Sequence, residues 1–283
     1  MISWTVTSDD AALLEAVRDY WDRRPCNVRH SRLPVGSKEF FDEVEKRKYF
    51  VEPHIPAFAE FAKWRGKRVL EVGCGIGTDT VNFIRAGAIV AAIDLSAESV
   101  KLAGQRICLD PGYRGRKASC HVGNVEDPPR SVNAFDLVYT FGVLHHTPNP
   151  HKAIANITRA LKRGGELRAM VYNKWSYKVA VSYLDELARG HIGAAEAIRQ
   201  HSEAQPGSPI TRVYDAEEAR ELVESSGLKL ERQWVDHIFP YRVEDYVQYR
   251  YRKHWWFKAM PDIVFRWLCH NFGWHRLIVA RKV

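Results

Sequence analysis

The stretch that most constrains this chain runs from Lys67 to Ser96. It opens with a short apolar run, Val69 to Val72, of a length typical of a buried strand, and three glycines follow at alternate positions. A helical pattern from Thr78 to Ala86 and a second apolar run, Ile89 to Ile93, then lead to Asp94. Glycines let a ligand lie against bare backbone, and the acid can accept hydrogen bonds from both hydroxyls of a ribose. This order of elements is typical of a nucleotide-binding βαβ unit.

The spacing of the glycines separates two kinds of nucleotide site. A dinucleotide fingerprint has the pattern G-x-G-x-x-G, but the sixth position here is Thr78. The loop instead reads Glu71-x-Gly73-x-Gly75-x-Gly77. It resembles motif I of the class I S-adenosylmethionine (SAM)-dependent methyltransferases, in which the acid and the glycine loop hold the amino-acid end of the cofactor. The resemblance implies an enzyme with SAM as its cofactor and S-adenosylhomocysteine (SAH) as the product.

The rest of the chain fits further repeats of strand and helix. We expect helices at 8–24, 38–52, 96–107, 149–161 and 211–226, and further strands at 119–122, 135–140, 166–171, 228–235 and 275–283. These patterns predict a doubly wound α/β sheet. The resemblance implies seven strands, mostly parallel, with an antiparallel last strand. We expect a helical cap at 1–62 and a SAM-binding domain at 63–283. This domain is expected to carry two insertions, a helical lid at about 175–210 and a second segment at 239–274.

The same resemblance indicates further cofactor contacts. Asn124 stands where the family usually has an acid, and its carbonyl oxygen can still accept from the adenine amino group. Thr140 and Phe141 end a strand at the edge where ligands of open α/β sheets collect. Tyr49, upstream of motif I, is expected beside the sulfonium. The expected cofactor contacts are Tyr49, Glu71, Gly73, Cys74, Gly75, Gly77, Asp94, Leu95, Asn124, Val125, Thr140 and Phe141.

A second motif begins at Phe135. It resembles the motif IV region of methyltransferases of quinone biosynthesis, in which an FD-V-----LHH pattern is familiar. The pattern ends here on His145 and His146, and Tyr172 follows the next strand. These three residues are the catalytic candidates, either as a general base or beside the acceptor, and the sequence does not choose among them. A base is needed only where the acceptor loses a proton.

An aromatic and basic segment lies between Phe239 and Trp274. The stretch from Tyr241 to Val283 contains nine Lys or Arg residues and three acidic residues. Its net charge is therefore +6, within a chain of net charge +8. The segment fits either a packed lid with solvated charges or the wall of an acceptor pocket. Basic residues beside an acceptor favour a carboxylate or phosphate, so we expect an aromatic or anionic small molecule. The candidate acceptor contacts are Tyr20, Tyr177, Tyr241, Trp255 and Trp256.

The resemblance implies methyl transfer to oxygen, nitrogen, sulfur or carbon of a small metabolite. Three alternatives remain open. A membrane-borne lipid or quinone acceptor would use Trp255 to Trp274 as an interfacial helix, although Pro261 argues against it. RNA is a second alternative, because basic and aromatic residues interleave, but no RNA-binding module is seen. A module that binds SAM or SAH without catalysis is the third. The oligomeric state is not readable.

Composition is that of an ordinary globular protein. Hydrophobic residues make up 46% and charged residues 27% of 283 residues, and no apolar run approaches the roughly 20 residues that span a bilayer. The N-terminal stretch lacks a secretory pattern, so we expect a cytoplasmic protein. The five cysteines show no paired spacing and the 12 histidines form no H-E-x-x-H array, so reduced thiols and no metal site are expected.

Overall fold

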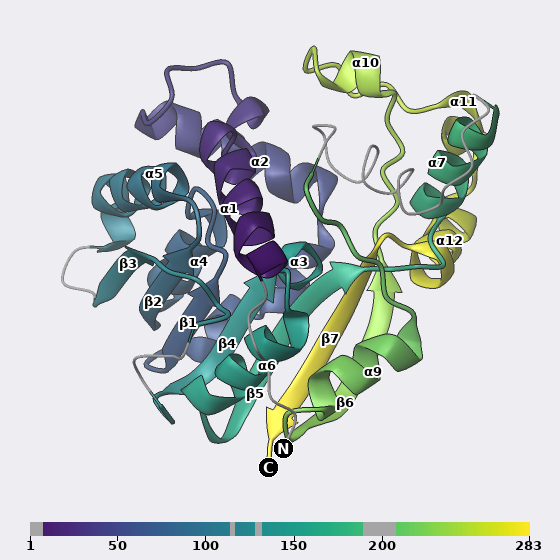
Figure 1. Ribbon diagram of the computed structural model, residues 1–283. Helices are drawn as coiled ribbons and strands as arrows, with labels where there is room; N and C mark the ends of the chain where they lie inside the picture. The colour runs from purple at the N-terminus through teal and green to yellow at the C-terminus, as the bar shows by residue number, and fades with distance from the viewer. Residues whose placement is uncertain (1–7, 114–116, 128–131, 189–207) are drawn as a thin grey trace.

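The computed structural model describes residues 8–113, 117–127, 132–188 and 208–283, arranged around one seven-stranded sheet (Figure 1). Its strands are β1 (Arg68–Val72), β2 (Ile89–Asp94), β3 (Ala118–Val122), β4 (Phe135–Phe141), β5 (Leu161–Tyr172), β6 (Leu228–Asp236) and β7 (His275–Lys282). They lie in the order β3-β2-β1-β4-β5-β7-β6. β1 to β5 run parallel, and β7 is antiparallel to both of its neighbours. The expected mostly parallel sheet with an antiparallel last strand is confirmed.

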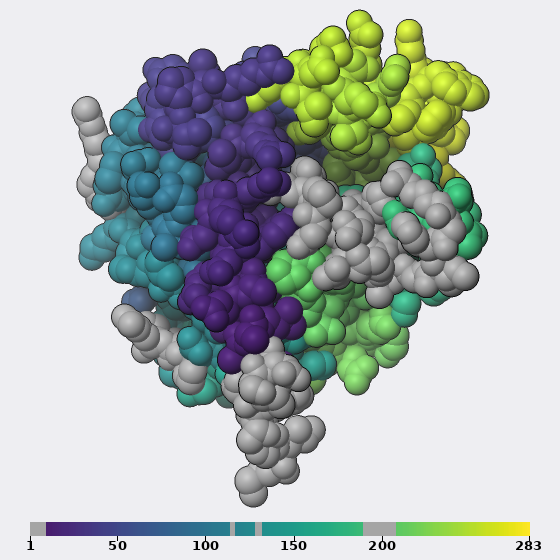
Figure 2. Space-filling view, turned by 45° about the horizontal axis from the view of Figure 1, so that its top comes forward, coloured from purple at the N-terminus to yellow at the C-terminus, as the bar shows by residue number. Residues whose placement is uncertain are grey.

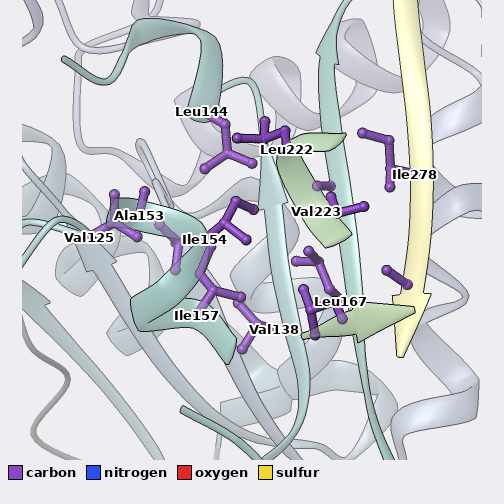
Figure 3. Close-up of a cluster of buried hydrophobic side chains, with 14 of the residues drawn as sticks. Val125, Val138, Leu144, Ala153, Ile154, Ile157, Leu167, Leu222, Val223 and Ile278 are labelled. Carbon is purple, nitrogen blue, oxygen red and sulfur yellow. The ribbon is translucent and has the colours of Figure 1, made fainter. Parts of the chain in front are cut away.

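Helices cover both faces of the sheet, as a parallel sheet requires. One face carries α3 (His54–Ala59), α4 (Thr78–Ala86) and α5 (Ala97–Leu109), and the other carries α6 (Pro150–Ala160) and α9 (Ala216–Glu224). Figure 3 shows the second interface, where apolar side chains of α6 and α9 pack on β4, β5 and β7. The labelled members on these elements are Val138, Ala153, Ile154, Ile157, Leu167, Leu222, Val223 and Ile278. This packing holds the strand ends that form the site.

A third layer, here called the roof, lies beyond the carboxyl ends of the parallel strands (Figure 1). It consists of α1 (Ser8–Arg23), α2 (Lys38–Val51), α7 (Tyr177–Ala188), α10 (Val243–Tyr246), α11 (Trp255–Ala259) and α12 (Asp262–Phe272). Short 3₁₀ turns are η1 (Val28–His30), η2 (Phe61–Trp64), η3 (Pro111–Tyr113) and η4 (Leu144–His146).

Two segments that are far apart in the sequence, residues 28–51 and the residues around α10, meet within the roof (Figure 2). The guanidinium of Arg47 lies 4.0 Å from the ring centroids of both Tyr246 and Tyr249, and it donates to the carbonyl oxygen of Tyr246. The hydroxyl of Tyr249 donates to the carbonyl oxygen of Arg29 over 3.1 Å. Cation–π stacking and hydrogen bonds thus join α2 and η1 to the segment around α10.

Several predicted helix boundaries differ from the structure by one or more residues, and two of the differences have a clear physical reason. The helix expected at 149–161 ends at Ala160, because Leu161 pairs with Phe135 of β4 and starts β5. The helix expected at 211–226 begins only at Ala216. There the carboxylate of Asp215 accepts from the backbone N–H of Glu217 and Glu218, and Glu218 accepts from the N–H of Asp215, which is a capping box.

The domain division at residues 62 and 63 stays a prediction. The insertion expected at 175–210 contains α7, but its residues 189–207 lie outside the described residues. Among the described helices, none is both long and apolar enough to cross a membrane.

Candidate active site

A cavity of about 1140 Å³ lies between the carboxyl ends of the parallel strands and the roof. Its lining includes the glycine loop after β1, the ends of β2, β4 and β5, and residues from α1, α2, α7 and the segment 237–275. Ligands of open α/β sheets bind at this edge, and drug-sized ligands occupy pockets of roughly 300–1,000 Å³. The cavity therefore has room for two small molecules side by side.

The glycine loop presents its backbone to the cavity. Gly73 has a φ of +76° and lines the cavity, and a Cβ at this position would lie 2.0 Å from Cγ2 of Val143. Cys74 and Gly75 also line it. Gly77 does not, because it caps the start of α4 with a φ of +77° and packs against Ala103. The first two glycines shape the wall, and the third shapes the turn into the helix.

Asp94 ties the glycine loop to the end of β2. Its Oδ2 accepts from the backbone N–H of Gly75 over 2.8 Å, and its Oδ1 accepts from that of Ser96 over 2.9 Å. Burial raises the pKa of Asp94, and the backbone hydrogen bonds oppose that shift. Asp94 and Leu95 line the cavity. Each carboxylate oxygen keeps a second acceptor site, so the side chain can also receive two ribose hydroxyls.

Asn124 and Val125 line the cavity near the end of β3. The carbonyl oxygen of the Asn124 side chain, which we expected to meet the adenine amino group, accepts from the backbone N–H of Glu126 over 2.9 Å. Because an amide oxygen has two lone pairs, the adenine contact stays a prediction. The hydrogen bond shows that Asn124 first organises its own turn.

A polar cluster lies beside the glycine loop, around the buried carboxylate of Asp79. Its Oδ1 receives the ammonium of Lys48 over 2.9 Å and the hydroxyl of Tyr49 over 2.8 Å, and its Oδ2 receives the hydroxyl of Tyr139 over 2.9 Å. Lys48 and Asp79 line the cavity, whereas Tyr49 does not. Burial alone would lower the pKa of Lys48, but the charges of Asp79 and Glu52 outweigh it and raise the pKa.

Neither Lys48 nor Asp79 was predicted as a site residue, although the position of Lys48 on its helix carried a signal. Lys48 follows Phe41 by seven positions and Val44 by four, which places it on the buried face of α2. Tyr49 is about 100° further around the helix, and its hydroxyl supports Asp79 from outside the cavity. Asp79 in the first turn of α4 carried no pattern of its own.

Glu71 at the end of β1 is buried and lines the cavity. The hydroxyl of Thr80 donates to its Oε2 over 2.5 Å. Burial, followed by the neighbouring Asp79 carboxylate, raises the pKa of Glu71. An ammonium group bound beside these two acids would therefore relieve their mutual repulsion.

Of the two candidates at the end of β4, only Phe141 lines the cavity. Its ring lies 5.8 Å from Nζ of Lys48 and 5.3 Å from the ring of His275. Thr140 is fully buried, and its hydroxyl has no hydrogen-bond partner among the described residues. Alternation along the strand turns neighbouring side chains to opposite faces.

The adjacent histidines of η4 take different positions. His145 is fully buried outside the cavity lining, where its ring stacks on Tyr172 at 3.6 Å and burial lowers its pKa. His146 lines the cavity, and its Nδ1 lies 2.8 Å from the carbonyl oxygen of Ile210. Because a carbonyl only accepts, Nδ1 carries the proton and Nε2 the lone pair. Tyr172 also lines the cavity, stacked on Trp274 at 4.0 Å.

Three of the five expected acceptor contacts, Tyr177, Tyr241 and Trp256, line the cavity, and the other two do not. Trp255 is 75% exposed, because α11 buries Phe257 and turns Trp255 away. Tyr20 is replaced in the lining by its neighbour Trp21 on α1.

Three further residues in the lining, Glu52, His237 and His275, had no sequence signal. Each offers a ligand atom, and these atoms all lie within 4.8 Å of one another. Their positions are too far apart in the chain for any spacing to join them.

Comparisons with known proteins agree with this geometry. A family described as "Methyltransferase domain" matches residues 70–169. A ubiquinone biosynthesis O-methyltransferase of Xanthomonas oryzae pv. oryzae is 36% identical over 130 residues, which cover 44% of this chain and 52% of that protein. The chain thus spans about half the length of that relative. The protein of the same name from Caulobacter vibrioides is 30% identical over 211 residues, covering 70% of this chain and 72% of that one.

The fold is also similar to those of solved methyltransferase structures. The geranyl diphosphate C-methyltransferase of Streptomyces coelicolor A3(2), solved with Mg²⁺, geranyl diphosphate and SAH, superposes with a TM-score of 0.60. The alignment covers 99% of this chain and all of that one at 15% identity, a level that speaks for the fold alone. The motif I loop, the strand order and the 30% identity over most of the Caulobacter protein together show that this chain belongs to the class I SAM-dependent methyltransferase family.

Proposed function

We propose that the protein transfers the methyl group of SAM to a small molecule, and that both bind in the one cavity. The observation that carries this proposal is the composition of the cavity wall. One part, the cofactor half, is lined by residues between Glu71 and Val125. The other part, the acceptor half, is lined by α1, α2, α7 and residues 237–275. Phe141, at the end of β4, and His146, in η4, line the same cavity.

The cofactor half fits the chemistry of SAM. Asp94 offers carboxylate oxygens to a ribose, and the bare backbone at Gly73 and Gly75 leaves room for a ligand. Lys48, the one residue of α2 that we assign to the cofactor half, offers a cation for the carboxylate of an amino acid, while Asp79 and Glu71 offer anions for its ammonium. Bound SAM supplies an electrophilic methyl group on a positively charged sulfur.

The residues around the reacting atoms would act mainly by alignment and by excluding water. Holding two reactants in the correct relative orientation can lower the activation free energy of such reactions by about 7–11 kcal/mol. The ring of Phe141 offers a face to a cation, a contact of about 1 kcal/mol. Where the acceptor loses a proton, His146 is our candidate base, because its Nε2 carries the lone pair and the residue lines the cavity. His145 is instead assigned to packing under Tyr172.

The acceptor half indicates an aromatic or anionic molecule. Tyr177, Tyr241 and Trp256 line it, and Lys178 and Arg47 bring positive charge to the same wall. Relatives named for ubiquinone biosynthesis are consistent with a phenolic acceptor, and we propose that class first. The cytoplasmic location stays a prediction.

The proposal is tested by tracing the methyl group. Purified protein is incubated with SAM that carries a deuterated methyl group and with a cell extract divided into small-molecule, lipid and RNA fractions. We expect label in the small-molecule fraction and none with Asp94→Ala. Label confined to RNA, or equal label with and without the protein, would contradict the proposal.

A second candidate, a membrane-borne acceptor, is favoured by the outer surface of the roof. Trp255, Ile263 and Trp267 are 75%, 72% and 56% exposed. Trp256 and Phe272, 38% and 43% exposed, continue this surface into the cavity lining. Such a surface can rest at a bilayer interface. Liposome flotation with anionic lipid tests it, since protein that stays at the bottom of the gradient has no such role.

A further inference from the structure

Two histidines and one glutamate of the acceptor half converge on one point. Glu52 follows α2, His237 follows β6, and His275 begins β7. Their ligand atoms all lie within 4.8 Å of one another, and all three side chains line the cavity. Nε2 of His275 stands 3.7 Å from Oε1 of Glu52. This distance is too long for a hydrogen bond and close to the separation of about 3–3.4 Å between two ligands of one ion.

The surroundings orient the histidines as metal ligands are oriented. Nδ1 of His275 is 2.9 Å from Nε2 of His54, so His54 can hold the far side of the His275 ring. Ligand histidines commonly have such a partner on their second nitrogen. His237 has a φ of +73°, a left-handed conformation that costs of order 1 kcal/mol in a residue with a side chain. Its ring is thereby directed to within 4.7 Å of the His275 ring.

Charge and burial also favour a ligand role. His275 is buried and His237 is half-buried, and both side chains line the cavity. A ligand histidine gives the metal the lone pair of one ring nitrogen. Lys178 and Lys48 would repel an added cation, while Glu52 and Asp236 oppose that repulsion from the other side.

We propose that Glu52, His237 and His275 form a binding site for one divalent transition-metal ion, with Zn²⁺ as the best fit, in the wall of the acceptor half. Two imidazoles and one carboxylate are a ligand set that Zn²⁺ uses where a coordination position is left open. The open position faces the cavity, since all three ligands line it. The three ligand atoms must approach one another by about 1 Å to bind an ion.

An ion here would select the acceptor. Its open position would take an oxygen atom of a phenol, a carboxylic acid or a diphosphate, and the ion would replace the proton of a hydroxyl, which passes to water. The site therefore explains how an oxygen acceptor could be held in its anionic form at neutral pH. This step rests on the proposed function, whereas metal binding itself does not.

The test is metal binding by the full chain without any acceptor. Protein stripped with EDTA is titrated with Zn²⁺ by calorimetry and with Co²⁺ by visible absorption. We expect one site per chain. Glu52→Gln keeps the shape and removes the anion, and His237→Asn suits the left-handed backbone that asparagine tolerates. Each should weaken Zn²⁺ affinity at least tenfold. His121→Asn, on the exposed end of β3, is the matched control and should bind as the wild type does.

Three results would overturn the proposal. One is the absence of a stoichiometric site in the wild type, and another is equal affinity in Glu52→Gln, His237→Asn and the control. The third is a thiolate-to-cobalt charge-transfer band, which would place the ion on Cys74 and Cys120, whose sulfurs are 3.6 Å apart. A parallel SAH titration of the metal-free wild type separates the cases, because SAH binding with no metal site would reject this proposal alone.

Discussion

The cofactor half of the cavity is lined mainly by residues of one continuous stretch, Glu71 to Val125, whereas the acceptor half joins residues of α1 and α2 and their neighbours to α7 and to residues 237–275. In the cofactor half, backbone groups hold the side chains in place. The backbone N–H groups of Gly75 and Ser96, for example, donate to the carboxylate of Asp94. In the acceptor half, side chains meet over long sequence distances. Arg47 and Tyr246 are 199 positions apart, and His54 and His275 are 221 apart.

This difference has a physical consequence. A wall made of backbone depends on a few glycines and caps and tolerates little change in them. A wall made of side chains from distant parts of the chain can change its chemistry while the sheet beneath it stays the same. We therefore expect substitutions in the cofactor half to abolish cofactor binding, and those in the acceptor half to alter stability or acceptor choice.

The largest effect is expected for Gly73→Ala. Its Cβ would lie 2.0 Å from Cγ2 of Val143, and the φ of +76° is strained for alanine. We expect a loss of at least about 3 kcal/mol in the free energy of unfolding and no measurable SAH binding. The matched control is Gly66→Ala, with a φ of +72° and no atom within 4 Å of the added Cβ, which should cost about 1 kcal/mol. Equal losses in urea unfolding would show that Gly73 has no special role.

Lys48→Met tests the ion pair beside the glycine loop. Asp79 would stay buried without its cationic partner, so we expect a loss of about 3 kcal/mol in urea unfolding. Adding Asp79→Asn to Lys48→Met should recover part of the lost free energy of unfolding, because the buried negative charge is then removed as well. Lys63→Met is the control, because Lys63 is 45% exposed in its pair with Glu166 and should cost less than about 1 kcal/mol. Lys48→Met alone should also weaken SAH binding about tenfold. Full SAH affinity in Lys48→Met would remove Lys48 from the cofactor site.

His30 makes the roof of the acceptor half sensitive to acid. Burial, with Arg47 and Lys48 nearby, lowers the pKa of His30 to about 3, whereas an unfolded histidine has a pKa of about 6.5. Below about pH 6.5 this histidine takes up a proton in the unfolded chain but stays neutral in the folded protein. Its contribution to the free energy of unfolding is therefore fully present at pH 7 and decreases as the pH falls. Between pH 7 and pH 5 the loss is about 2 kcal/mol.

The measurement is urea unfolding of wild type, His30→Gln and the control His121→Gln at pH 7 and pH 5. His30→Gln should lose about 2 kcal/mol less than the wild type over this range, and His121→Gln should behave as the wild type does. The same acid loss in all three proteins would exclude His30 as the cause.

Prediction from the sequence succeeded where neighbours in the chain are neighbours in space. The strand, glycine loop and helix around Gly73, and Asp94 at the next strand end, lie where local spacing placed them. Lys48 was missed in favour of Tyr49, because one residue along a helix turns the side chain by about 100°. Trp255 points outward because Phe257 is the buried residue of α11, and no local pattern reveals which face a five-residue helix buries.

The histidines of the acceptor half could not be predicted for a different reason. His237 follows β6 and His275 begins β7. The sequence does not reveal that β7 inserts between β5 and β6, which is what brings these two strand ends together. Glu52 reaches them only because α2 lies over the same strand ends. Such long-range convergence leaves no spacing in a single sequence.

The most direct test of the division into halves is calorimetric titration with SAH of the wild type, Asp94→Ala and Glu52→Gln, with NAD as a control ligand. We expect micromolar SAH binding by the wild type, no NAD binding, and at least tenfold weaker SAH binding by Asp94→Ala, about 1.4 kcal/mol. Glu52→Gln in the acceptor half should lose less affinity than Asp94→Ala does. A wild type that binds no SAH, or an Asp94→Ala protein that binds it as tightly as the wild type, would contradict the assignment of residues Glu71 to Val125 as the cofactor half.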